Sequence, residues 1–113
     1  MRVSYPVENA LYQWEEGHRR LRELTAEPRG SGRIWRAVDA VRDELRRRIG
    51  PTLTATELAD LYGRGTDWAL DAIRWVMPEE TADLDPQAVV DGAFFLYLRG
   101  ATDYAGGRLI PQD

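Results

Sequence analysis

The stretch that decides the fold is TLTATELADLYGRGTDWALDAIRWV, residues 52–76. Thr54 and Glu57 have the spacing of a capping box, in which each side chain accepts a hydrogen bond from a backbone N–H at the start of a helix. Two glycines in the run Y-G-R-G then interrupt the helical pattern, and the following T-D pair is suited to cap a new helix. The stretch therefore predicts two short helices joined by a tight turn, over residues 55–62 and 67–77.

Two longer helices are predicted upstream. Apolar side chains recur there at steps of three or four residues, which is typical of helices that bury one face. The predicted helices cover residues 7–25 and 33–49, and the segment EPRGSG between them has the composition of a loop. Because this loop is short, we expect the two helices to lie side by side and antiparallel, as an αα-hairpin.

The last predicted helix covers residues 86–99. Asp85 is suited to cap it and Pro86 to occupy its first turn. Its sequence is apolar on nearly every face, which is typical of a helix buried in the centre of a domain or in an oligomer interface. Gly92 in this helix and Gly17 in the first one are expected to let a neighbouring helix come close, because glycine has no side chain.

Together these segments predict a single all-α domain of about five helices over residues 1–113, with residues 108–113 as a mobile tail. The length suffices for one hydrophobic core. The sequence has no cysteine, which excludes disulfides and zinc–thiolate sites. No apolar run reaches the roughly 20 residues that span a bilayer, and the N-terminus lacks the apolar segment of a signal peptide. We therefore expect a cytoplasmic protein that does not enter membranes.

Charge is distributed unevenly along the chain. Residues 27–50 hold seven arginines and four acidic residues, a net charge of +3, whereas residues 51–113 hold four arginines and eleven acidic residues, a net charge of −7. Such a bipolar pattern can steer a binding partner or a second copy of the chain. The alternative is two solvated faces. All fifteen basic residues are arginine, which we attribute to the codon usage of a GC-rich genome.

The run ELADLYG, residues 57–63, is similar to the second helix and turn of bacterial helix-turn-helix regulators. In that motif a small residue such as Ala59 lets two helices approach, and a glycine such as Gly63 makes the turn. The resemblance implies that the next helix reads DNA. The sequence departs from the motif because the expected turn is only about one residue long, and because Asp67 and Asp71 would be repelled by phosphates. An ordinary corner between two helices is the alternative.

Catalytic and cofactor motifs are scarce. Glu15 and His18 have the E-x-x-H spacing of helical metal sites, but such sites need a second pair and this chain has one histidine. Carboxylate pairs such as Asp39 and Asp43 can bind cations, yet they are more common as solvated surface groups. The glycines form no phosphate-binding loop, and no serine lies in a nucleophile motif. We therefore expect a non-enzymatic protein without metal or cofactor.

Aromatic residues point to protein binding. Four tryptophans and five tyrosines occur in 113 residues, and these residue types dominate the energetics of protein interfaces. Trp68 and Trp75 are seven residues apart, so they fall on nearly the same face of one helix. Either both fill the core or they form a binding patch. The residues predicted to bind a partner are Trp68, Trp75, Arg42, Arg46 and Arg47.

Three hypotheses follow from the sequence. The first is a small helical domain that binds another protein in an adaptor or regulatory role, with a homodimer as a further arrangement that the charge pattern allows. The second is a DNA-binding regulator, whose binding would weaken steeply with salt. The third is an enzyme or metal protein that uses Glu15 and His18. In the DNA-binding alternative the phosphate contacts would come from Arg42, Arg46, Arg47 and Arg48.

Overall fold

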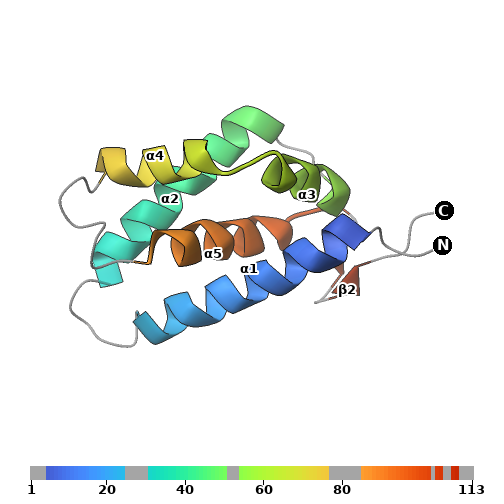
Figure 1. Cartoon of the computed structure of the whole chain (residues 1–113), viewed down its shortest axis with the longest axis horizontal. Helices are drawn as coiled ribbons and strands as arrows, with labels where there is room; N and C mark the ends of the chain where they lie inside the picture. Colours follow the sequence, from blue (N-terminus) through green and yellow to red (C-terminus); the bar gives the residue numbers. More distant parts are fainter. Residues whose placement is uncertain are drawn as a thin grey trace.

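The computed structural model describes residues 5–24, 31–50, 54–76, 85–102, 104–105 and 108–109. These residues form one all-helical globule with a short two-stranded ladder at its C-terminal end (Figure 1). The predicted all-α domain is confirmed, and the observed helix ends differ from the predicted ones by two residues at most. The helices are α1 (Tyr5–Leu24), α2 (Ser31–Ile49), α3 (Ala55–Gly63), α4 (Asp67–Val76) and α5 (Pro86–Leu98).

α5 lies in the middle of the domain and contacts each of the other four helices. In Figure 1, α1 runs along one side of it, and α2 and α4 lie on the other side. Residues Ala88–Phe94 of α5 are all buried. The helix that is apolar on nearly every face is therefore the central one, as its sequence predicts.

The long helices α1 and α2 differ from the predicted hairpin in one respect. They run in opposite directions, as expected, but α5 lies between them (Figure 1). Among the described residues, each of the two contacts α5 more extensively than it contacts the other. The physical reason is that α5 has apolar surface on several faces and buries more of it by separating the two helices.

α1 and α5 approach each other closely at two glycines. A Cβ atom at Gly17 would lie 2.3 Å from the Cβ of Asp91, and one at Gly92 would lie 2.2 Å from Cδ1 of Leu21. These separations are far below van der Waals contact, so a larger residue at either position requires a neighbour to move. The predicted role of both glycines in close helix packing is confirmed.

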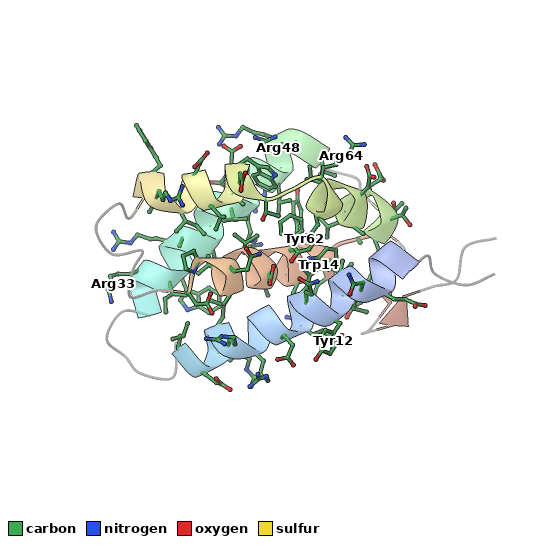
Figure 2. All side chains as sticks on the ribbon, in the orientation of Figure 1. Tyr12, Trp14, Arg33, Arg48, Tyr62 and Arg64 are labelled. Atoms are coloured by element: carbon green, nitrogen blue, oxygen red, sulfur yellow. The ribbon has the colours of Figure 1, made fainter. Side chains whose placement is uncertain are left out.

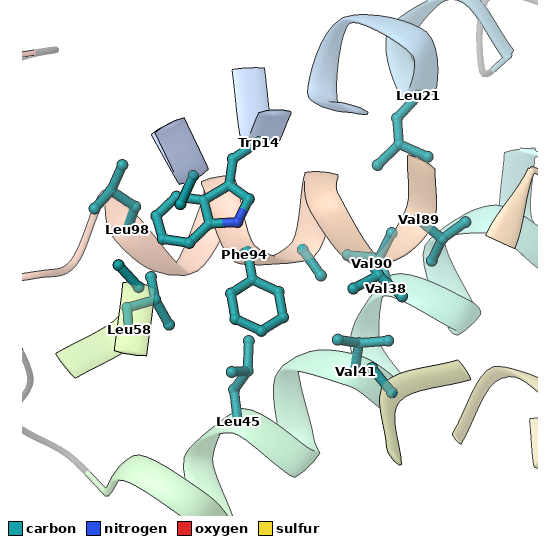
Figure 3. Packing of buried hydrophobic residues seen from close by; sticks show 14 of the residues in the cluster. Trp14, Leu21, Val38, Val41, Leu45, Leu58, Val89, Val90, Phe94 and Leu98 are labelled. Atoms are coloured by element: carbon teal, nitrogen blue, oxygen red, sulfur yellow. The ribbon is translucent and has the colours of Figure 1, made fainter. Parts of the chain in front are cut away.

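Aromatic rings fill the centre of the core. Trp14 of α1 is fully buried and stacks on Phe94 of α5, with ring centroids 5.6 Å apart. Tyr62 of α3 meets both rings edge-on, at 5.6 Å from Trp14 and 5.1 Å from Phe94. Figure 3 shows Leu45 of α2 on the other side of Phe94. The side chain of Phe94 thus lies where α1, α2, α3 and α5 meet.

α3 and α4 are the two short consecutive helices that the sequence predicts, but they pack on different neighbours. α3 packs mainly on α1 and α4 mainly on α2, and among the described residues these contacts exceed any between α3 and α4 themselves. Residues 64–66 join the two helices, one residue fewer than the predicted helix bounds leave between them. Gly65 has a φ of 109°, a backbone conformation that glycine adopts at little cost. The predicted capping box at the start of α3 is present.

The C-terminal end of the described chain is a small antiparallel ladder of β1 (Tyr104–Ala105) and β2 (Arg108–Leu109). Of the predicted mobile tail, residues 108–113, the structure describes the first two, whose backbone pairs with β1. Several predicted positions lie outside the described residues: Thr25, residues 27–30 of the predicted loop, Met77 and residues 110–113.

Candidate functional site

A groove of about 580 Å³ opens on the surface between α2 and α4. Its apolar lining includes Ala40 of α2 and Ala72 of α4, whose small side chains leave space between the helices. Trp68, Trp75 and Val76 of α4 complete this lining. The other lining residues are charged, namely Asp43, Glu44, Arg47, Arg48 and Asp71. The groove therefore combines apolar and aromatic side chains with charged groups of both signs, as many protein-binding sites do.

Trp75 stands out on this surface. Its side chain is 88% exposed, the largest fraction among the exposed large hydrophobic side chains of the described chain. The adjoining Val76 is also exposed. A single exposed apolar residue is common, but an indole and a valine beside an apolar groove form a continuous patch of the kind that marks interaction sites.

Trp68 lines the same groove but is held in place. Its ring is half-buried against Phe94, with centroids 6.1 Å apart. Its indole N–H donates a hydrogen bond of 3.1 Å to the carbonyl of Gly65. The guanidinium of Arg48 lies over the ring, 4.5 Å from its centroid, in cation–π geometry. The two tryptophans that sequence spacing places on one face thus have different surroundings: Trp68 is fixed and Trp75 projects into solvent.

The four predicted arginines belong to the C-terminal half of α2, and Figure 2 shows Arg48 there beside α4. Each pairs with an acidic residue about one turn earlier. Such exposed pairs contribute little to stability, and they neutralise much of the cluster's positive charge. Arg47 and Arg48 line the groove, whereas Arg42 and Arg46 are not among its lining residues. The ion pairs are Arg42–Asp39 at 3.9 Å, Arg46–Asp43 at 2.9 Å, Arg48–Glu44 at 3.5 Å, and Arg47–Glu44.

The exposed surface of α4 is acidic, and one of its acidic residues, Asp71, also lines the groove. Asp67 and Asp71 are both exposed, and the only arginine of this helix, Arg74, lies 3.4 Å from the carboxylate of Asp71. A helix that reads DNA lies among phosphates, which repel carboxylates. The charge of this face therefore opposes the role that the helix-turn-helix resemblance implies.

A buried polar network, which sequence analysis did not find, joins α1, α3 and α5. Asp91 is only 7% exposed, and its Oδ1 accepts hydrogen bonds from the Tyr62 hydroxyl at 2.8 Å and from Gln87 Nε2 at 3.0 Å. The Tyr62 oxygen also lies 2.9 Å from Oε1 of Gln13. Burial raises the pKa of the Asp91 carboxyl and that of the Tyr62 hydroxyl. One signal was visible in the sequence: a lone carboxylate within an apolar helix.

The same network borders a smaller cavity of about 190 Å³ between α1 and α5. Two pairs of its polar lining groups bond to each other: Gln87 with Asp91, and Arg20 with Asp85 at 3.0 Å. Because these groups already satisfy each other, we interpret the network as a polar link between three helices.

His18 and Glu15 are placed in different environments. The His18 ring packs against Phe95, with centroids 4.8 Å apart, while Glu15 is exposed. Burial, together with the nearby positive charges of Arg22 and Arg99, lowers the pKa of His18. Among the residues that the structure describes, no group of three or more histidine or acidic side chains is arranged to hold a metal ion.

Comparisons of the chain with protein-family models, with curated proteins and with solved structures found no match. No helix within the described ranges is both long enough and apolar enough to cross a membrane. The function is therefore argued from the residues themselves, and the α2–α4 groove is the candidate site.

Proposed function

We propose that this chain is a non-enzymatic domain that binds another protein chain through the α2–α4 groove, in an adaptor or regulatory role. The observation that carries the proposal is the 88% exposure of Trp75 at the edge of this groove. Burying a large apolar side chain is favourable by about 1.5–3 kcal/mol, and tryptophan is among the residues most enriched at interface hot spots. A cytoplasmic location is part of the proposal, since the cysteine-free sequence suits it.

The surroundings of Trp75 support a preformed binding surface. Trp68 is fixed by Phe94 on one side and by Arg48 on the other, so it loses little conformational freedom when a partner covers it. Ala40 and Ala72 leave room for an inserted side chain. Charged groups of both signs on the α2 side of the groove supply the polar rim that typically surrounds an apolar interface core.

DNA binding is the second candidate, favoured by the exposed arginines of α2. Phosphates would have to displace the carboxylates that now pair with Arg46 and Arg47, and the acidic face of α4 would oppose the contact. If DNA is nevertheless bound, charge reversal at these two arginines should abolish binding, and affinity should fall steeply with salt.

Affinity capture from a lysate of the native cell, with nuclease treatment, tests the proposal. The baits are the wild-type chain, Trp75→Ala and the matched control Tyr12→Ala. Tyr12 is also a strongly exposed aromatic residue, 68%, but it lies on α1 on the far side from Arg48 (Figure 2). We expect a nuclease-resistant protein that the wild type and Tyr12→Ala capture in similar amount and Trp75→Ala does not.

Two outcomes would count against protein binding at this groove. Equal capture by Trp75→Ala would remove Trp75 from the interface. Loss of every captured protein after nuclease treatment would favour the DNA-binding candidate, which the charge-reversed arginine variants then test directly.

A further inference from the structure

We propose that the chain that occupies the α2–α4 groove is a second copy of this protein, in a twofold-symmetric dimer. This inference rests on the proposed function, because it names the partner of the same groove. It goes beyond that function in fixing both the identity of the partner and the way the two chains meet.

The shape of the surface is self-complementary. Each copy carries a projecting indole at Trp75 and, beside it, a groove with space over Ala40 and Ala72. In a twofold interface, any contact from one copy to the other is repeated in reverse. One axis beside the groove therefore places the Trp75 of each copy in the groove of the other, so that both exposed indoles and both grooves are covered at once.

The charges of the two helices are also complementary. The C-terminal part of α2, residues 39–49, holds four arginines and three acidic residues, a net charge of +1. α4 holds Asp67, Asp71 and Arg74, a net charge of −1. When α4 of one copy lies across α2 of the other, the same twofold axis brings these opposite charges together twice. Electrostatic complementarity of this kind guides association and fixes the orientation of the partners.

Sedimentation velocity over a range of micromolar concentrations tests the inference. We expect the wild-type chain to show a monomer–dimer equilibrium that shifts with concentration. Trp75→Ala should weaken the dimer by at least about 30-fold, the loss expected when a central interface tryptophan is truncated. The control Tyr12→Ala should dimerise as the wild type does.

A charge-swap experiment tests the arrangement of the two chains. Asp71→Arg places an arginine on α4 that faces the arginines of the partner copy, and Arg47→Glu places a glutamate on α2 that faces the partner's acidic α4. Each variant alone should be monomeric. An equimolar mixture of the two should dimerise again, because both contacts across the twofold axis then join opposite charges.

Far-UV circular dichroism checks that both charge variants stay folded. Each removes one exposed ion pair, Asp71–Arg74 or Arg47–Glu44. Exposed pairs typically contribute no more than about 1 kcal/mol, so a folding defect is not expected. The mixing result therefore reports on association.

The outcomes separate this inference from the proposed function. A wild-type chain that stays monomeric, or a dimer that Trp75→Ala leaves equally tight, overturns the second-copy inference. A mixture of the charge variants that stays monomeric overturns the proposed arrangement. If the monomeric chain still captures a different protein in a Trp75-dependent way, the proposed function stands without this inference. Absence of both self-association and Trp75-dependent capture contradicts both.

Discussion

Two helix pairs of this protein pack in opposite ways. α1 and α5 meet at Gly17 and Gly92, where the space between the helices does not admit even one additional carbon atom without movement. α2 and α4 instead leave a groove of about 580 Å³ between them, with the exposed Trp75 at its edge. Close packing at the two glycines stabilises the fold, and the cavity beside Gly17, about 190 Å³, is much smaller than the α2–α4 groove. The open second pair leaves apolar surface that the monomer does not bury.

Two tryptophans, one from each helix pair, differ in the same way in their burial. Trp14 in the first pair is fully buried against Phe94, whereas Trp75 in the second is almost fully exposed. The residue type is the same and both lie on amphipathic helices. The surrounding helices therefore decide how much each tryptophan contributes to the stability of the monomer. Truncation to alanine should have very different effects at Trp14 and at Trp75.

The largest expected effect is that of Trp14→Ala. Truncating a buried tryptophan leaves a cavity and should lower the free energy of unfolding by about 3–5 kcal/mol. Trp75→Ala should change the same quantity by no more than about 0.5 kcal/mol. Urea unfolding followed by far-UV circular dichroism, at concentrations where the chain is monomeric, measures both. Equal effects would contradict the assignment of the two tryptophans to a stabilising core and a binding surface.

Gly17→Ala should have an intermediate effect. Its new Cβ would lie 2.3 Å from the Cβ of Asp91, a backbone-proximal atom that cannot easily move. We expect a loss of about 1–3 kcal/mol in the free energy of unfolding, the usual range for overpacking. The control is Gly32→Ala in α2, where a Cβ meets nothing within 4 Å. That change should be neutral or stabilising by up to about 1 kcal/mol. A neutral Gly17→Ala variant would show that α1 and α5 separate easily.

Asp91→Asn should change how stability depends on pH. Burial raises the pKa of Asp91 in the folded state above its unfolded value, so the folded chain binds this proton more tightly. The carboxyl's contribution is fully present below its unfolded pKa of about 3.9 and is lost as pH rises through the folded pKa. Asparagine can keep the bond from Tyr62 without a charge. The stability of the variant relative to the wild type should therefore increase from acidic to neutral pH.

Urea unfolding of both proteins across this pH range measures that difference. The pKa of His18 is lowered in both, and its protonation destabilises the folded state as pH falls below about 6.5. This contribution cancels in the comparison. Parallel stability curves for wild type and Asp91→Asn would mean that the network does not depend on the protonation of Asp91.

The smallest expected effect is that of Arg48→Met, which keeps much of the side-chain bulk over Trp68 but removes the cation. A loss of about 0.5–1 kcal/mol in unfolding free energy is expected from the missing cation–π contact. The control is Arg46→Met on the same helix, which removes an exposed ion pair away from the groove. Chemical denaturation of the two variants compares them. A larger loss for Arg46→Met would contradict the role of Arg48 in holding Trp68.

The helix-turn-helix resemblance shows what a local match can miss. Ala59 and Gly63 occur where the motif needs them, and the capping box of α3 forms as its sequence predicts. Yet α3 packs on α1 while α4 packs on α2. Caps and turns depend on neighbouring residues, whereas the packing of two consecutive helices depends on which other apolar faces compete for them.

The sequence by itself determined the helices and the central place of α5. Caps, glycines and prolines act within a few residues, so they mark helix ends locally. A helix that is apolar on nearly every face is favourable only where it is buried, in the centre of a domain or in an oligomer interface. The close approach at Gly17 and Gly92 was also foreseeable, because a glycine inside a helix is costly unless a neighbour uses the space.

Only the tertiary structure decided which helices became neighbours. The candidate site, the α2–α4 groove, follows from that choice of neighbours. Sequence spacing placed Trp68 and Trp75 on one face of α4. In the structure, contacts with Phe94 and Arg48 hold Trp68 in place, whereas Trp75 is exposed. The link between Asp91 and Tyr62 likewise joins residues that are far apart in the chain. Periodicity shows which face of a helix is apolar; because hydrophobic burial is non-directional, it does not show what that face will meet.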